Sequence, residues 1–229
     1  MASALRFDDK RILVIEDHAE MRSSMKSMLD RLGGRKVDIS INGEEDIECL
    51  IKKEYDLELS DYELGRGKDG QQILEETRHA KLLRAGAAYV MVTAAQTIEM
   101  VMGALEYHPD GYVTKPITFD TLNTRLHRIF NHKSYFQHIN NAIDNNDIHT
   151  ALRECERLIN TNPKLLLPTR RIQGKLLFDN GDIDQAKTIY QSVLQTREVA
   201  WAILGLCKCL HAQGDWQNAI QQLEKVTQS

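Results

Sequence analysis

The chain has 229 residues, with 29 basic and 33 acidic side chains and a formal net charge of -4 at pH 7. This balance gives no broad electrostatic attraction to nucleic acid or to an anionic membrane surface. No apolar run approaches the roughly 18 residues that span a bilayer, and residues 1–10 lack the apolar core of a signal peptide. We therefore expect a cytoplasmic protein, not inserted in a membrane, whose partners are proteins.

The first half of the chain predicts a parallel sheet. Residues 11 to 132 alternate short β-rich runs with amphipathic helical stretches, which is typical of a sheet with helices on both faces. Strands are predicted at residues 12–15, 37–41, 55–60, 87–92 and 111–114. Helices are predicted from Ala19 to a stop at Gly33-Gly34, after Asn42-Gly43, near Asp69-Gly70, from about Thr97, and just after Pro116.

The second half predicts helical repeats. Asn146-Asp147, Gly181-Asp182 and Gly214-Asp215 are spaced by 35 and 33 residues, and each pair is followed by an alanine at Ala151, Ala186 or Ala219. This period indicates stacked helical hairpins, because a tight turn and a small residue let two helices pack closely. We expect two domains, residues 1–133 and 134–229, and we expect the natural protein to continue beyond Ser229 or a partner to cover that end.

Acidic residues follow two of the predicted strands. Glu16-Asp17 ends the first strand and Asp61 ends the third. In an open parallel sheet the carboxyl ends of the strands meet at one edge, so three carboxylates gather there and repel one another unless a cation is present. Mg²⁺ is the natural cation, because it prefers oxygen ligands and keeps several waters.

Complementary groups end the other two strands. Thr93-Ala94 ends the fourth strand, where a hydroxyl can donate to a phosphoryl oxygen beside a small residue. Lys115-Pro116 ends the fifth, where an ammonium supplies positive charge and proline fixes the backbone. Each of these residue pairs alone is weak evidence for a site. The whole set, in this order and with each pair at a strand end, indicates a phosphoryl-accepting site.

The segments ILVIEDHAEMRSSM, YDLELSDYELGRGKDGQQILEETR, VMVTA and DGYVTKPI resemble the receiver domain of bacterial two-component response regulators, over nearly all of residues 10–132. The resemblance implies an α/β flavodoxin-like fold with strand order 2-1-3-4-5 and Asp61 as the phosphoacceptor. It implies Asp17 and Asp61 as direct Mg²⁺ ligands, Glu16 acting through water, and the backbone carbonyl of Glu63 completing the metal shell. It also implies that Thr93 and Lys115 contact the phosphoryl group.

The same resemblance implies a switch and its partners. Tyr112, three residues before the lysine, moves between two rotamers in the family as the threonine shifts, and Met100, Val101 and Tyr107 lie on or near the face that repacks. A sensor histidine kinase or phosphotransfer protein is the expected donor, and a homodimer through the receiver is an alternative assembly. Phosphoryl transfer and slow hydrolysis are self-promoted in the family, so the chain is not expected to be an ordinary enzyme.

Four other features of the sequence need interpretation: a buried acid, a glycine-rich loop, the histidines and the cysteines. Glu58 lies in a strand with both faces covered, so we expect a partner or partial solvent access there. Gly65 to Lys68 lacks the ending of a phosphate-binding loop, because Asp69 follows the lysine. None of the eight histidines stands at metal-ligand spacing from a partner, and the four scattered cysteines favour reduced buried thiols.

The repeats resemble tetratricopeptide repeats, with Gly174 and Tyr190 at the glycine and aromatic positions and Pro163 closing a repeat. We expect this half to bind an unidentified protein target. A generic helical bundle used for dimerisation remains an alternative, as does a transcription factor whose helical half binds DNA. The ten basic and ten acidic residues of residues 134–229 favour protein binding, and an enzyme in a portion beyond this chain stays open.

Overall fold

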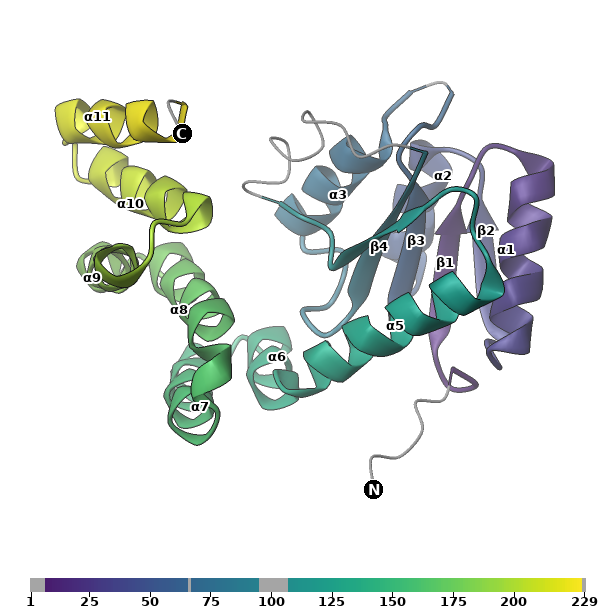
Figure 1. The fold of residues 1–229 in the computed structure, drawn as a ribbon, viewed down its shortest axis with the longest axis horizontal. Helices are drawn as coiled ribbons and strands as arrows, with labels where there is room; N and C mark the ends of the chain where they lie inside the picture. Colours follow the sequence, from purple (N-terminus) through teal and green to yellow (C-terminus); the bar gives the residue numbers. More distant parts are fainter. Residues whose placement is uncertain (1–6, 66, 95–106, 228–229) are drawn as a thin grey trace. The chain divides into compact units, whose positions relative to one another are not determined.

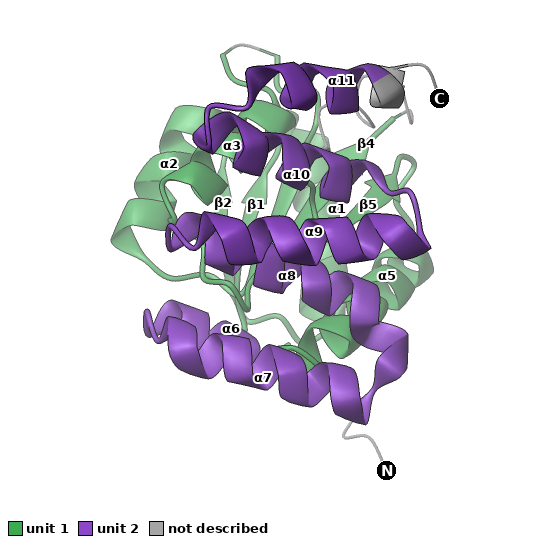
Figure 2. Cartoon of the chain, turned by 90° about the vertical axis from the view of Figure 1, so that its left-hand side faces the viewer, with its two compact units in different colours: residues 1–137 green, residues 138–229 purple. Residues whose placement is uncertain are grey.

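The computed structural model describes residues 7–65, 67–94 and 107–227. The chain forms two compact units, residues 1–137 and 138–229 (Figure 2), whereas the sequence placed the boundary after residue 133. Among the described helices, none is long and apolar enough to cross a membrane.

The first unit is built on one parallel sheet of five strands in the order β2-β1-β3-β4-β5, as predicted (Figure 1). The strands β1 and β4 are covered on both faces, which explains why their sequences are nearly continuous apolar runs. The strands are β1 (Arg11–Ile15), β2 (Lys36–Ser40), β3 (Leu57–Asp61), β4 (Ala88–Thr93) and β5 (Gly111–Thr114).

Alternate side chains of the strands form two cores, because successive residues of a strand point to opposite faces. On one face, Val14 and Leu59 pack with residues of α1 (Ala19–Arg31) and α5 (Phe119–Ser134). On the other, Leu13 and Ile15 pack with residues of α2 (Gly43–Lys52) and α3 (Gly70–His79). The sheet is therefore a rigid middle layer whose carboxyl edge carries the candidate site.

The predicted helix boundaries have local causes. Gly33 takes a φ of 88° after α1, and the amide of Gly34 donates to the carbonyl of Leu29 at 2.9 Å. The Asn42 side chain caps α2, and Asp69 begins a capping box at α3. The helix expected from Thr97, with Met100 and Val101, lies outside the described residues.

The second unit consists of helices joined by short turns (Figure 1). At each of the three repeat positions one turn residue has a positive φ: 55° at Asn146, 87° at Gly181 and 78° at Gly214. The predicted hairpins are confirmed. The elements are α6 (Gln137–Asp144), α7 (Ile148–Thr161), a 3₁₀ turn (Pro163–Leu165), α8 (Leu166–Asp179), α9 (Ile183–Thr196), α10 (Ala200–Ala212) and α11 (Trp216–Thr227).

Small residues let these helices approach one another. Ala151, Ala186 and Ala219 are buried, as their repeated position predicts. A Cβ added at Gly174 of α8 would lie 2.7 Å from a ring carbon of Tyr190 of α9. The glycine and aromatic expected at these two positions therefore pack directly on each other.

Of the two surroundings expected for Glu58, partial solvent access is absent. Its exposed fraction is 0%, so there is no partial solvent access, and among the described residues neither carboxylate oxygen has a hydrogen-bond partner. Burial raises the pKa of Glu58 well above its usual value, and the neighbouring charge of Asp46 raises it further. This carboxyl group is therefore held neutral inside the core between the sheet, α2 and α3.

Candidate functional site

The parallel order of the strands brings the predicted residues to one edge of the sheet. Glu16 and Asp17 follow β1, Asp61 ends β3, Thr93 ends β4 and Lys115 follows β5. Glu16, Asp61 and Thr93 are buried, and the backbone N–H of Lys115 donates to the carbonyl of Thr93 at 2.8 Å. Four strands thus supply one compact polar group.

Lys115 joins two of the carboxylates. Its Nζ lies 2.7 Å from Oδ2 of Asp61 and 3.3 Å from Oε2 of Glu16. Burial lowers the pKa of Lys115, but the hydrogen bond and charge of Asp61 outweigh it and the pKa is raised. Burial also raises the pKa of Glu16, and the charge of Asp61 adds to this effect. The ammonium is therefore the resting counter-ion of both acids.

Asp17 is fixed by the loop that follows β3. Its Oδ2 accepts a hydrogen bond from the amide of Gly65 at 3.1 Å. A Cβ at Gly65 would lie 2.9 Å from the same oxygen, so a larger residue here would require the Asp17 side chain to shift. Burial raises the pKa of Asp17, but the hydrogen bonds from Gly65 and His18 outweigh it and lower the pKa. Asp17 is thereby kept ionised.

His18 belongs to this group and was missed by sequence reasoning. Its Nδ1 lies 2.7 Å from Oδ1 of Asp17 and 3.2 Å from Oε1 of Glu16. The ligand atoms of the three residues lie within 4.8 Å of one another, so they could hold a metal ion. The sequence spacing gave no histidine a metal-binding neighbour, so the structure adds His18 to the candidate site. The signal was its position directly after the acidic pair.

The acidic group fits a divalent cation. Oδ1 of Asp61 is buried and, among the described residues, has no hydrogen-bond partner. Glu16 and Asp17 supply further oxygen atoms from the loop that follows β1, the strand beside β3. Oxygen donors of this kind are what Mg²⁺ prefers, so Glu16, Asp17 and Asp61 are the residues that would hold it. Glu63 lies in the loop beyond Asp61 with an exposed side chain, and its carbonyl remains a predicted ligand.

The two tyrosines of the expected switch face lie beside the second core. Tyr112 of β5 is half-buried, and it pairs with Met91 in the sheet. Tyr107 also packs against this core, and its carbonyl accepts a hydrogen bond from the Gln71 side chain at 3.0 Å. Burial raises the pKa of Tyr112. Both rings are thus connected to the α3 side of the sheet.

A five-stranded parallel sheet in the order β2-β1-β3-β4-β5, with acids, a threonine and a lysine at its carboxyl edge, is the fold of a receiver domain. Residues 12–127 match the response regulator receiver domain family, and residues 177–229 match the tetratricopeptide repeat family. The chain belongs to the response regulator receiver domain family and is a two-component response regulator that carries tetratricopeptide repeats.

Individual relatives agree with this assignment. Chemotaxis protein CheY-3 of Vibrio cholerae is 28% identical over 120 residues, covering 52% of this chain and 91% of that protein. The transcriptional regulatory protein DltR of Streptococcus agalactiae is 32% identical over 118 residues, 51% of this chain and 50% of that protein. The N-terminal domain of a response regulator/sensory box/GGDEF 3-domain protein from Carboxydothermus hydrogenoformans matches with a TM-score of 0.50 and 27% identity, covering 56% of this chain and all of that structure.

Proposed function

We propose that Asp61 accepts a phosphoryl group from a sensor histidine kinase or phosphotransfer protein, and that this modification controls protein–protein interactions. The observation that carries the proposal is the asymmetry of the Asp61 carboxylate. Oδ2 is bound by Lys115 at 2.7 Å, whereas Oδ1 has no hydrogen-bond partner among the described residues. Oδ1 is therefore the oxygen whose lone pairs are available for attack on phosphorus.

In this reaction the bond from Oδ1 of Asp61 to phosphorus forms as the bond between phosphorus and the donor imidazole nitrogen breaks. The leaving nitrogen keeps the electron pair of that bond. When bound by Glu16, Asp17 and Asp61, Mg²⁺ would neutralise charge on the phosphoryl oxygens. Asp61 exchanges one negative charge for a group carrying roughly two, and Lys115 is already placed to compensate for part of this increase.

The switch follows from the residues next to Asp61. The Thr93 hydroxyl is proposed to donate to the new phosphoryl oxygens, as in the family. The backbone N–H of Lys115 donates a hydrogen bond to the carbonyl of Thr93 at 2.8 Å. A shift of the end of β4 would therefore also move the end of β5. Tyr112 lies three residues before Lys115, and we assign it the reporter position on the face that contacts partners. Couplings of this kind are typically worth about 1 to 3 kcal/mol, which shifts populations without refolding a domain.

The tetratricopeptide-like unit is proposed to hold the output partner. Its equal numbers of basic and acidic residues give no electrostatic reason to bind DNA. DltR, a transcriptional regulatory protein, is matched over only 50% of its length. We therefore favour a phosphoacceptor signalling protein with a protein target over a DNA-binding regulator, and over an enzyme acting on a separate substrate.

The test is phosphorylation of the full chain by acetyl phosphate with Mg²⁺, followed by intact mass measurement. We expect one phosphoryl group per chain, sensitive to hydroxylamine, and its loss in Asp61→Asn. Asp69→Asn, at the N-terminus of α3, is the matched control and should be modified normally. Modification that persists in Asp61→Asn would refute the assignment.

A further inference from the structure

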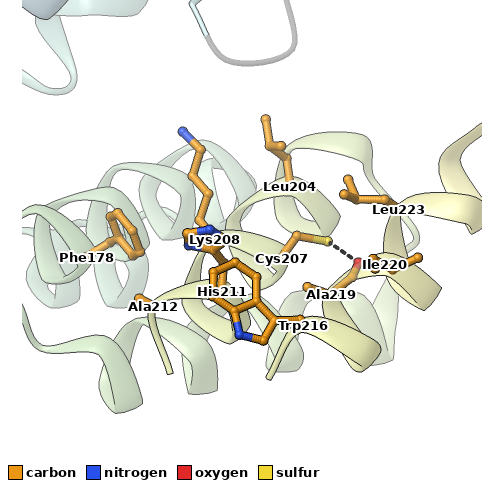
Figure 3. Close-up of a pocket in the computed structure, with 10 residues that line it drawn as sticks. All are labelled: Phe178, Leu204, Cys207, Lys208, His211, Ala212, Trp216, Ala219, Ile220 and Leu223. Carbon is orange, nitrogen blue, oxygen red and sulfur yellow. Dashed lines mark hydrogen bonds between the residues drawn. The ribbon is translucent and has the colours of Figure 1, made fainter. Parts of the chain in front are cut away.

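An apolar groove of about 330 Å³ opens on the second unit, between α10 and α11 and beside the end of α8 (Figure 3). Phe178 lies at one end of the groove, and Leu204 and Leu223 lie at the other. The thiol of Cys207 forms part of the wall and donates to the carbonyl of Ala219 at 3.5 Å. The groove is thus a surface built by consecutive helices of the repeat.

The α11 side of the groove is an exposed apolar face. Trp216, Ile220 and Leu223 have exposed fractions of 56%, 58% and 44%. Their spacing of four and three residues places them on one side of the helix. Adjacent large apolar side chains that stay open to water mark interaction surfaces on soluble proteins.

The repeat shows what covers the corresponding face one hairpin earlier. Moving back 33 residues, the distance between Gly214 and Gly181, takes Trp216 to Ile183, Ala219 to Ala186 and Leu223 to Tyr190. In that hairpin the face is covered, since all three residues pack in one core with Ala202 and Leu206 of α10. Tyr190 has an exposed fraction of 5%, against 44% at Leu223. Helix α10 is therefore the natural template for the occupant of the groove.

The differences between the two hairpins favour an apolar helix in the groove. Lys187 of α9 corresponds to Ile220 of α11, so an apolar residue replaces a charged one. Cys207 corresponds to Gly174, and Leu223 corresponds to Tyr190. A helix bound in the groove would therefore contact the side chain of Leu223 where α10 contacts the larger ring of Tyr190. It therefore has no need of a glycine in the position of Gly205.

The charge of the groove adds a further requirement. Among the described residues that line the groove, Lys208 and His211 are basic and none is acidic. The ring of His211 packs against that of Trp216, with 4.2 Å between the ring centroids. An acidic residue on the flank of the occupant is complementary to this border.

We propose that the groove between α10 and α11 binds one amphipathic helix of a partner protein, which packs on these helices as α10 packs on α8 and α9. The partner helix carries apolar residues at positions i, i+3 or i+4, and i+7, with acidic residues beside them. This inference rests on the proposed role of the second unit in protein binding and names the chemistry of its target. It does not depend on phosphorylation of Asp61.

The test uses two fluorescein-labelled peptides that copy residues 197–213. Both peptides carry Cys207→Ser and Cys209→Ala to prevent oxidation, and the second, acidic peptide also carries Lys208→Glu. We expect saturable anisotropy with the full unphosphorylated chain, and tighter binding of the acidic version. Ile220→Glu in the chain should raise Kd at least ~10-fold, which corresponds to about 1.4 kcal/mol. Ile51→Glu, an exposed apolar position on α2, is the matched control and should leave Kd unchanged.

Each result decides the proposal. Absence of saturable binding, or equal Kd for Ile220→Glu and the parent chain with both variants folded by circular dichroism, would overturn it. Light scattering that shows a concentration-dependent dimer abolished by Ile220→Glu would also overturn it, because a second copy would then occupy the groove. Phosphorylation of Asp61 is measured separately on Ile220→Glu, so failure of the groove leaves the phosphoacceptor test intact.

Discussion

The ring of Tyr190 on α9 lies against the backbone of Gly205 on α10, closely enough that a Cβ at Gly205 would collide with it. Gly174 of α8 contacts the same ring from another helix. One aromatic side chain is thus enclosed by two positions without side chains, on two helices from consecutive hairpins. The packing of three helices depends on this arrangement.

Gly205→Ala should destabilise the second unit by about 1 to 3 kcal/mol, because an added methyl group overpacks the contact. Both tryptophans of the chain, Trp201 and Trp216, lie in this unit, so denaturant unfolding followed by tryptophan fluorescence reports on it. In a Tyr190→Leu background the same substitution should cost less, because the ring is gone. Equal costs in both backgrounds would show that the contact does not limit the packing.

Mg²⁺ should raise the melting temperature of the first unit, and Asp17→Asn should remove most of this increase. Binding to the folded state stabilises it by about 2.7 kcal/mol when the free ion is 100 times Kd. Differential scanning calorimetry with and without MgCl₂ measures the shift. Asp184→Asn, on the exposed surface of α9, is the control and should keep the full increase; an undiminished shift in Asp17→Asn would remove this residue from the metal site.

Stability should fall as pH rises above about 5, and Glu58→Gln should flatten this dependence. Burial raises the pKa of Glu58 well above 4.5 and the pKa of Asp46 to about 7. Between the unfolded and folded pKa values the folded state binds more protons, so stability is fully present below the unfolded pKa and is lost as pH increases. The slope is at most about 1.4 kcal/mol per pH unit for each group.

Urea unfolding at pH 5, 6, 7 and 8 measures this slope for the first unit. Glu48→Gln, an exposed position on α2, is the matched control and should leave the slope unchanged. If Glu58→Gln and the parent chain lose stability in parallel, then the buried carboxyl group does not titrate in this range.

His18→Asn should weaken Co²⁺ binding by about 10-fold while changing Mg²⁺ binding little. Imidazole is a good ligand for transition metals, whereas Mg²⁺ favours oxygen atoms, and Nδ1 of His18 lies within the group formed with Glu16 and Asp17. Visible absorption of bound Co²⁺ and calorimetry with Mg²⁺ make the comparison. His79→Asn, exposed on α3, controls for the remaining histidines, and an equal loss in this variant would exclude His18 as the ligand.

The meeting of Asp17, Asp61, Thr93 and Lys115 at one edge could be predicted because each residue ends or follows a strand and parallel strands end at one edge. The sheet order came from the resemblance to receiver domains. His18 could not be identified from spacing rules, since metal spacings are defined on helices and strands, whereas three consecutive residues converge here in the loop after β1. The surroundings of Glu58 depend on α2 and α3, whose packing the sequence of β3 does not specify.

In the second unit the turn residues and the alanines of the hairpins were predictable from their period. The groove was not, because the same positions are covered in one hairpin and open in the next. Tyr190 and Leu223 occupy equivalent places in the sequence, but Tyr190 is covered by α10, whereas Leu223 is exposed among the described residues.

The positive φ of Asn146, Gly181 and Gly214 gives every hairpin the same kind of turn. A duplicate of residues 167–199, one period of 33 residues, inserted after Val199 would keep the link of residues 197–199 between α9 and the helix that follows it. The array can lengthen by whole hairpins while the receiver domain stays unaltered, so the reach of the repeats and the target they recognise can diversify independently of the receiver.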